Sequence, residues 1–391
     1  MANSNYRNRV KLKMIKNKNR ILLLLSLIIL LTACKPAWEI EVIENDRSTG
    51  VINQESVSFY IDKYLEETSE VPLGQMLYDV GYTLIDEITF KSTNDSNRTY
   101  PWDDIGVTAT ILESGEILLG DGTKIKPNQI EIKADSISMT EYYSIMDIAP
   151  TIAYAMELPE LPESKGQVRL NHSGGFEHAV MIFLDGLQYD LLTSLIDAGK
   201  LPFFETLDTI QPGITVYPSI TTSASAALLT GTPPKDNGVY GYGYRTTTST
   251  TLFDLFVQNG KSVVAVEGSG LSFNLRNAET ILSGDRDNNG FADDNVYENS
   301  LEIIHSDMPD LLYIHFHDID DMGHKFGPLS SEYKTSIIHA DNYLEEIVKA
   351  LPEGTLITIF ADHGMRTTED GGNHGTLTAD DLIIPIIFIE K

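Results

Sequence analysis

Seven side chains that can bind a metal or act as a nucleophile lie in short motifs within the last 207 residues of this 391-residue chain. They are Asp185, Thr221, Asp320, His324, Asp362, His363 and His374. Carboxylates and imidazoles together suit a borderline divalent ion, and a hydroxyl beside such an ion becomes a nucleophile. We therefore predict two neighbouring divalent metals and a hydroxyl nucleophile, with zinc favoured over calcium by the imidazoles.

The motifs close apolar runs that are typical of buried strands. These runs are VMIFLDG, ITVYPSIT, LLYIHFHDID and LITIFADHG. Strand-like and helix-like segments alternate after His178, which predicts an α/β fold with a mostly parallel sheet and helices on both faces. Such sheets bind ligands beyond the carboxyl ends of their strands. Motifs far apart in the sequence are thus expected to lie together.

Some assignments stay open at the level of the residues alone. In DIDDMGHKFGP, Asp318 and Asp321 compete with Asp320, which we favour as the ligand. Asp185 can also serve as a helix N-cap, and His374 as an ordinary loop histidine. In YPSITTSASAALLTG a hydroxyl at the start of the helix would face a terminus that stabilises anions. Four hydroxyls qualify there: Ser219, Thr221, Thr222 and Ser223.

Residues 1–33 have the pattern of a secretory signal peptide, with seven basic residues before the apolar run ILLLLSLIILL. Residues 31–34, LTAC, resemble a bacterial lipobox, in which Cys34 becomes the lipidated first residue. Cys34 is the only cysteine, which excludes a disulfide or a thiolate metal site elsewhere. We predict a lipid-anchored protein on the extracytoplasmic face of the cell membrane, touching the membrane only through its anchor.

The chain is strongly acidic, with a net charge of −29 at pH 7 that becomes −36 once the seven basic signal residues are removed. Such a surface repels nucleic acid, so nucleic-acid binding is disfavoured. Composition divides the rest of the chain into a tether over 34–55, a small α+β or mostly β module over 56–140 and a catalytic domain over 141–391. Trp102 in the small module is either a binding platform or a core aromatic.

Together the motifs resemble the alkaline phosphatase superfamily, and most closely its type I phosphodiesterase and nucleotide pyrophosphatase branch, over residues 178–391. In that branch the nucleophile is a Thr four residues after an aromatic residue that precedes Pro, and nine before Thr-Gly. This spacing selects Thr221 in YPSIT…LLTG. The resemblance implies that one metal is held by Asp185, Thr221, Asp362 and His363, and the other by Asp320, His324 and His374.

Two features depart from the family pattern. Where these phosphodiesterases carry an Asn that holds a phosphoryl oxygen, this chain has Tyr242, and Arg245 nearby is a candidate phosphate ligand or a surface arginine. Residues 141–170 resemble the segment that ends the family's catalytic domain, but here they precede the first catalytic strand. We predict a circular permutation, with a coincidental linker helix as the alternative.

The segment DRDNNGFADDN has the spacing of an EF-hand-like loop, in which a structural Ca²⁺ would be bound by Asp285, Asp287, Asn289 and Asp293. A solvated acidic turn is the alternative, because position 12 of the loop is Val296.

The sequence thus predicts a two-metal phosphohydrolase that cleaves phosphodiester or pyrophosphate bonds of a nucleotide, lipid head group or polymer through a phospho-threonine on Thr221. A phosphomonoesterase or a phosphotransferase on the same scaffold is one alternative. A non-catalytic ligand-binding lipoprotein is the other.

Overall fold

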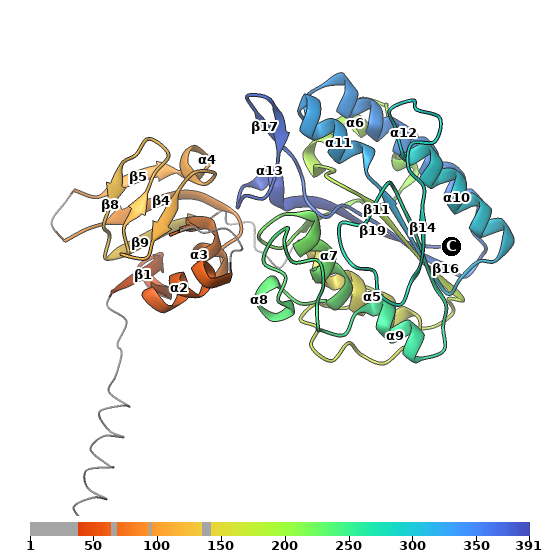
Figure 1. Ribbon diagram of the computed structural model, residues 1–391, viewed down its shortest axis with the longest axis horizontal. Coiled ribbons are helices and arrows are strands. Elements are labelled where there is room, and N and C mark those ends of the chain that lie inside the picture. Colours follow the sequence, from red (N-terminus) through yellow and green to blue (C-terminus); the bar gives the residue numbers. More distant parts are fainter. Residues whose placement is uncertain (1–37, 64–68, 94–95, 135–141) are drawn as a thin grey trace, which may run out of the picture.

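The computed structural model describes residues 38–63, 69–93, 96–134 and 142–391. The predicted signal peptide and Cys34 lie outside the described residues. Figure 1 shows a small domain beside a large one, which confirms the predicted small domain preceding an α/β domain. Within the described ranges, no helix has the length and apolar character needed to cross a bilayer.

The small domain contains two sheets and three described helices. The five-stranded sheet has the order β2 (Arg47–Asn53), β1 (Glu39–Glu44), β9 (Gln129–Ala134), β4 (Ile85–Lys91) and β5 (Arg98–Pro101). The second has the order β3 (Glu70–Pro72), β6 (Thr110–Leu112), β7 (Ile117–Leu118) and β8 (Lys124–Ile125). The helices are α2 (Gln54–Lys63), α3 (Leu73–Asp79) and α4 (Trp102–Ile105).

The prediction of a tether over residues 34–55 is wrong for its described part. Strand β1 pairs antiparallel with β2 and parallel with β9, so this segment forms part of the small domain. Ile40 and Val42 alternate with charged residues along β1, and both are buried. The polar composition of one strand face concealed this alternation, which is the pattern of a half-buried strand.

The large domain is built on one eight-stranded sheet. Every neighbouring pair in it is parallel except the two pairs made by β19. The strand order is β10 (Tyr143–Ser144), β12 (Gln211–Ile214), β19 (Ile383–Glu390), β16 (Thr355–Phe360), β11 (His178–Leu184), β15 (Leu311–Phe316), β13 (Val263–Glu267) and β14 (Glu279–Leu282). The predicted mostly parallel sheet is confirmed.

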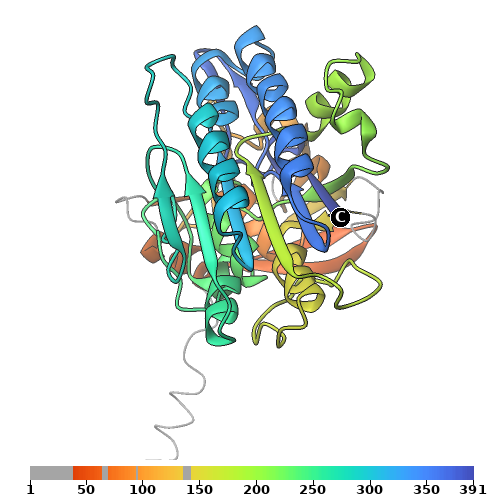
Figure 2. The ribbon, with the colours of Figure 1, turned by 90° about the vertical axis from the view of Figure 1, so that its right-hand side faces the viewer.

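Helices cover both faces of this sheet (Figure 1). One face carries α5 (Ile148–Ala155), α7 (Thr221–Thr230) and α9 (Leu252–Gln258). The other carries α6 (Tyr189–Asp197), α10 (Asp293–Ser306), α11 (Asp318–Phe326) and α12 (Ser331–Ala350), and Figure 2 shows α10 and α12 lying along the strands. The remaining elements are η1 (Ile145–Asp147), η2 (Phe204–Thr206), α8 (Pro234–Asn237), α13 (Ala379–Leu382) and the hairpin of β17 (Arg366–Thr368) and β18 (Gly371–Asn373).

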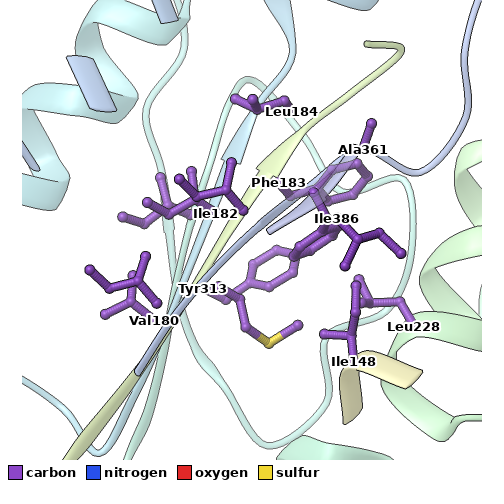
Figure 3. Close-up of a cluster of buried hydrophobic side chains, with 14 of the residues drawn as sticks. Ile148, Val180, Ile182, Phe183, Leu184, Leu228, Tyr313, Ala361 and Ile386 are labelled. Carbon is purple, nitrogen blue, oxygen red and sulfur yellow. The ribbon is translucent and has the colours of Figure 1, made fainter. Parts of the chain in front are cut away.

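The central strand β11 is buried on both faces, as a strand covered by two helix layers must be. All of its residues from Ala179 to Leu184 are buried. Val180 and Ile182 project to one side of the sheet, whereas Phe183 projects to the other, where Tyr313 also lies (Figure 3). This two-sided burial fixes the strand whose end carries Asp185.

Residues 142–170 are integral to the large domain. Strand β10 pairs parallel with β12, and Ile148 and Ile152 of α5 are fully buried in the main core. The Asp147 carboxylate accepts hydrogen bonds from the backbone of Ser144 and Gln167 and pairs with Arg169. A permuted terminal segment would have to pack in this way, but the permutation itself stays a prediction.

Candidate active site

Neighbouring parallel strands bring the predicted site residues to one edge of the sheet. Strands β16, β11 and β15 are adjacent and parallel, so their carboxyl ends lie side by side. Asp185 directly follows β11, Asp362 and His363 follow β16, and Asp320 lies in the first turn of α11 beyond β15. The backbone N–H of Asp185 donates to Phe316 O at 3.0 Å, which ties two of these ends together.

The first group contains Asp185, Asp362, His363 and Thr221, all of them buried. His363 Nε2 lies 3.5 Å from Asp185 Oδ1, 3.2 Å from Asp362 Oδ2 and 3.3 Å from Thr221 Oγ1. Gly186 N donates to the other Asp362 oxygen at 3.1 Å. The four side chains that the family resemblance assigns to one metal therefore converge around a single nitrogen.

The hydroxyl of Thr221 differs from those of its three rivals. Ser219 donates to Thr376 O and Ser223 to Val239 O, so both are bound to backbone carbonyls. The hydroxyl of Thr222 is buried and has no hydrogen-bond partner among the described residues. Only Thr221, the first residue of α7, faces a predicted metal ligand. The geometry thus distinguishes between hydroxyls that the residues alone left equivalent.

The second group contains Asp320, His324 and His374. His324 Nε2 lies 3.3 Å from Asp320 Oδ2 and 3.1 Å from His374 Nε2, and His374 Nε2 lies 3.6 Å from Asp320 Oδ1. The His363 and His374 rings stack with centroids 3.5 Å apart, which joins this group to the first. Ligand atoms of Asp320, His363 and His374 lie within 4.8 Å of one another, as do those of Asp185, Asp362 and His363.

The orientation of these side chains fits divalent metals. Nδ1 of each of the three histidines faces a backbone carbonyl, which leaves Nε2 directed into the site: His363 to Gly364, His374 to Ser219 and His324 to Gly372. Among the described residues, buried oxygens of all three carboxylates lack a hydrogen-bond partner: Asp185 Oδ1, Asp320 Oδ1 and Asp362 Oδ2. Buried charges of this kind are unfavourable unless a cation pairs with them or a proton neutralises them.

Burial and the closeness of the carboxylates also shift the pKa values of the site residues. Burial, followed by the charges of Asp362 and Asp320, raises the pKa of Asp185 well above its ordinary value. Burial also raises the pKa of Asp362 to about 6. It lowers the pKa of His363 to about 4 and that of His374 to about 3, so both rings are neutral at pH 7. Histidine binds a metal through a neutral imidazole, so the protonation state of these two rings is the one that metal binding needs.

The sequence matches the type I phosphodiesterase / nucleotide pyrophosphatase family over residues 179–267 and 271–384, together more than half of the chain. The chain belongs to this family. The resemblance inferred from the motifs is therefore confirmed, and all seven predicted site residues lie within the matched ranges.

Curated relatives of this phosphodiesterase-family chain include the catalytic subunit of human GPI ethanolamine phosphate transferase 3, which is 25% identical over 238 residues. This match covers 52% of the chain and 21% of the human protein. The Saccharomyces cerevisiae GPI ethanolamine phosphate transferase 3 is 34% identical over 82 residues, 21% of the chain and 8% of the yeast protein. The chain therefore spans about a fifth or less of the length of these relatives.

Among solved structures, phosphonoacetate hydrolase from Sinorhizobium meliloti in complex with phosphonoformate aligns with a TM-score of 0.38 and 21% identity. This alignment covers 49% of the chain and 56% of the hydrolase. Murine ectonucleotide pyrophosphatase / phosphodiesterase 5 aligns with a TM-score of 0.39 and 18% identity, covering 49% of the chain and 58% of the murine protein.

The rivals of Asp320 in this family member have other roles or positions. Asp318 accepts hydrogen bonds from the backbone of Ala292 and Asp293, and Asp293 accepts from the backbone of His317 and Asp318. These reciprocal bonds connect the starts of α10 and α11, so Asp318 is a structural residue. Asp321 is exposed and lines a neighbouring pocket.

The reciprocal pair also bears on the predicted calcium site, which stays a prediction. Each oxygen of Asp293 accepts a hydrogen bond from a backbone amide beyond the loop. Asp285 and Asp287 lie in an exposed turn and accept hydrogen bonds from the backbone of Asn289 and Gly290. Asp293 differs from these two residues because it is buried, begins α10 and bonds to the start of α11.

Tyr242 and Arg245 lie at different places beside the cluster. The Tyr242 ring lies 6.4 Å from the His374 ring and is 56% exposed, so it stands at the mouth of the site. Arg245 donates to Leu271 O and lines a pocket of about 320 Å³ together with His317 and Asp321. Tyr242 is thus beside a ligand of the second group, whereas Arg245 lies in the neighbouring pocket.

Three residues that the sequence reasoning missed lie directly behind Asp185: Glu267, His315 and His317. Ligand atoms of Asp185, His315 and His317 lie within 4.8 Å of one another. The signal in the sequence was YIHFH, in which two histidines at alternate positions point to the same side of a strand end.

The small domain packs against three loops that surround the site. Tyr217, Tyr240, Leu377 and Leu382 of the large domain are buried in the hydrophobic core of the small domain. Trp102 is 1% exposed, and its Nε1 donates to Leu377 O at 2.6 Å. The binding-platform interpretation of Trp102 is therefore wrong, and the residue fixes the loop that follows His374.

Replacing Trp102 by Phe removes this hydrogen bond and leaves the buried Leu377 carbonyl without it, at a cost of about 1–3 kcal/mol. We expect kcat/KM to fall by about tenfold if the loop that carries His374 loses its position. Trp38→Phe is the matched control, because Trp38 donates to Glu113 O in an exposed contact within the small domain. Equal steady-state activity of the two variants would contradict a role for the domain contact.

Proposed function

We propose that the chain cleaves phosphodiester or pyrophosphate bonds through a covalent phospho-threonine on Thr221. The observation that carries this proposal is the position of Thr221 Oγ1, 3.3 Å from His363 Nε2 at the first residue of a ten-residue helix. A hydroxyl there meets both the helix terminus, which stabilises negative charge, and the converging metal ligands. Membership of the phosphodiesterase family supports the same chemistry.

The side chains fit two resident metals, which we propose to be zinc. Asp185, Thr221, Asp362 and His363 would hold one ion, and Asp320, His324 and His374 the other. When bound, the ions would supply positive charge that lowers the pKa of the threonine hydroxyl and stabilises the departing oxygen.

Thr221 acts in two steps. Its Oγ1 loses its proton to solvent and attacks phosphorus; the new Oγ1–P bond forms as the P–O bond to the leaving group breaks, and the departing oxygen takes a proton from water. Water then attacks the same phosphorus, the Oγ1–P bond breaks, and the Thr221 hydroxyl is restored. Tyr242 at the mouth can donate its phenol O–H to a phosphoryl oxygen, because burial and nearby carboxylates raise the pKa of this group. Arg245 would contact the group on the far side of the phosphate.

Replacing Thr221 by Ala should lower turnover by about a thousandfold or more, since the covalent route is lost. The bound metal, measured by elemental analysis of a 36–391 chain, should stay near two ions because six of the seven proposed ligands remain. Thr222→Val is the matched control: this neighbour is also buried but does not face His363. Undiminished turnover of Thr221→Ala on a chromogenic phosphodiester would refute the nucleophile.

A phosphotransferase is the second candidate, because the curated relatives carry the name GPI ethanolamine phosphate transferase. Transfer and hydrolysis would share the phospho-threonine and differ only in whether an alcohol or water attacks it. The relatives are much longer than this chain, so their acceptor cannot be assigned to it directly. A phosphomonoesterase differs instead in the substrate of the first step.

The three reactions are separable with one panel of substrates. We expect a chromogenic diester to react faster than the matching monoester, and the diester rate to be unaffected by added glycerol if water is the acceptor. Transfer would convert part of the product into glycerol phosphate, measured by phosphorus NMR. A monoester that reacts faster than the diester would contradict the phosphodiesterase proposal. Fewer than about two tightly held metals per chain, with no turnover, would favour the non-catalytic ligand-binding alternative.

We also propose that Cys34 carries a lipid that holds the enzyme on the extracytoplasmic face of the membrane. Support comes from the charge, length and lipobox-like end of residues 1–34. In cells that express the full chain, Cys34→Ser should move the enzyme from the membrane fraction to the soluble fraction or leave an uncleaved precursor. Ser26→Ala, within the apolar run, is the control. Membrane recovery of a processed Cys34→Ser protein would rule out the lipid anchor.

A further inference from the structure

Behind Asp185 lies an array of three residues: Glu267, the last residue of β13, His315 in β15 and His317 just beyond it. Glu267 and His315 are almost completely buried, and His317 is largely so. None of the three is among the seven predicted site residues. Each is nevertheless in contact with Asp185 or with another member of the array.

The two imidazole rings bridge the same pair of carboxylate oxygens. His315 Nδ1 lies 2.9 Å from Glu267 Oε2, and His315 Nε2 lies 3.1 Å from Asp185 Oδ2. His317 Nε2 lies 3.0 Å from Glu267 Oε2, and its Nδ1 lies 3.8 Å from Asp185 Oδ2. Both contacts to Asp185 therefore involve Oδ2. Asp185 Oδ1, which has no hydrogen-bond partner in the described part of the chain, faces His363 instead.

Packing holds the rings in this orientation. His315 is stacked between Phe183, at a centroid distance of 3.8 Å and an angle of 7°, and His317, at 3.8 Å and 33°. A Cβ at position 268 would lie 2.8 Å from His317 Cδ2, so Gly268 leaves the room that the second ring needs. Packing this tight restricts the movement of both rings and so keeps them against Asp185 Oδ2.

Glu267 sets the direction of the hydrogen bonds. Burial alone would raise the pKa of Glu267, but the charges and hydrogen bonds of His315 and His317 outweigh it and lower the pKa to about 2. A carboxylate only accepts hydrogen bonds, so His315 Nδ1 and His317 Nε2 are the donors to Glu267. The opposite nitrogens of both rings then face Asp185 Oδ2, and a proton on either of these nitrogens joins the ring to Asp185 by a hydrogen bond or ion pair.

We infer that Glu267, His315 and His317 are positioning residues that hold Asp185 Oδ2 and so present Asp185 Oδ1 to the first metal position. They contact neither Thr221 nor the other ligands of that position. The inference rests on the proposed function only in taking Asp185 as a metal ligand. Residues that orient a metal ligand from behind typically contribute 10–100-fold to metal affinity.

The test is the affinity for Zn²⁺, measured by competition with a chromogenic chelator on a 36–391 chain. Glu267→Gln keeps the size of the side chain but replaces the accepting carboxylate by an amide. We expect one of two zinc sites to weaken by about 10–100-fold, with the thermal midpoint little changed. Glu279→Gln, in the adjacent strand and exposed, should leave both affinities unchanged.

A second pair of variants separates orientation from simple packing. His315→Gln can place an amide N–H toward Asp185, whereas His315→Leu fills similar space without a polar group. We expect the Gln variant to retain tighter zinc binding than the Leu variant when both are folded by circular dichroism. Equal zinc affinity of the two variants would contradict positioning by hydrogen bonding.

Two further results would overturn the inference. One is unchanged zinc affinity in folded Glu267→Gln. The other is a wild-type chain that holds three ions, of which Glu267→Gln loses one without weakening the other two, since the array would then be a metal site itself. The outcome for Thr221 is independent: weakened zinc binding in Glu267→Gln would stand even if Thr221→Ala stayed fully active.

Discussion

The site depends on three carboxylates that share one buried space. Asp185, Asp320 and Asp362 each have a buried oxygen without a hydrogen-bond partner among the described residues. After burial itself, the charges of Asp362 and Asp320 raise the pKa of Asp185, and the charge of Asp320 contributes to the raised pKa of Asp362. Like charges at this separation are unfavourable unless protons or cations lie between them. The mostly parallel sheet creates this conflict, because it brings the strand ends that carry these residues together. Positive charge supplied from outside the chain is the physical way to resolve it.

Much of the fold and of the candidate site could be predicted because each motif ends an apolar run. A buried strand such as β11 can be recognised in the sequence as a short apolar run. The residues that follow it then lie at the carboxyl edge of the sheet. Asp185 and Asp362 follow from this rule alone. Thr221 does not: four neighbouring hydroxyls satisfy the same pattern, and only three-dimensional geometry shows which one faces His363. The spacing of this motif in the family also points to Thr221, but spacing gives no physical reason for the choice.

The features that sequence reasoning missed are contacts between distant segments. Asp293 matches a calcium loop locally, but it is held by the amides of His317 and Asp318, more than twenty residues away. Strand β1 looks polar until its pairing with β9, about ninety residues later, buries one face. Glu267 is one acidic residue among 57 Asp and Glu residues until two histidines converge on it. Such partners are distant in the sequence, so a local sequence pattern does not predict them.

The core of the small domain holds three loops of the large domain that surround the site. Tyr217 precedes Thr221, Tyr240 precedes Tyr242, and Leu377 follows His374; all three are buried in the core of the small domain. Loops are the least constrained parts of a fold, yet the site needs their side chains held to within fractions of an ångström. A second hydrophobic core that encloses one residue from each loop supplies that constraint without placing any of its own residues among the ligands.

Because the chain has a large negative net charge, bound divalent cations would also help the site to attract an anion. A phosphate ester is an anion, and a protein with a net charge of −29 repels it at long range. The site itself contributes three carboxylates, while the imidazoles of His363 and His374 are neutral at pH 7. Without bound cations the centre would therefore repel its own substrate. Two divalent ions would exceed the three negative charges by one positive charge, so the residues proposed to hold them would govern the binding of a phosphate ester as well as the proposed chemistry at Thr221.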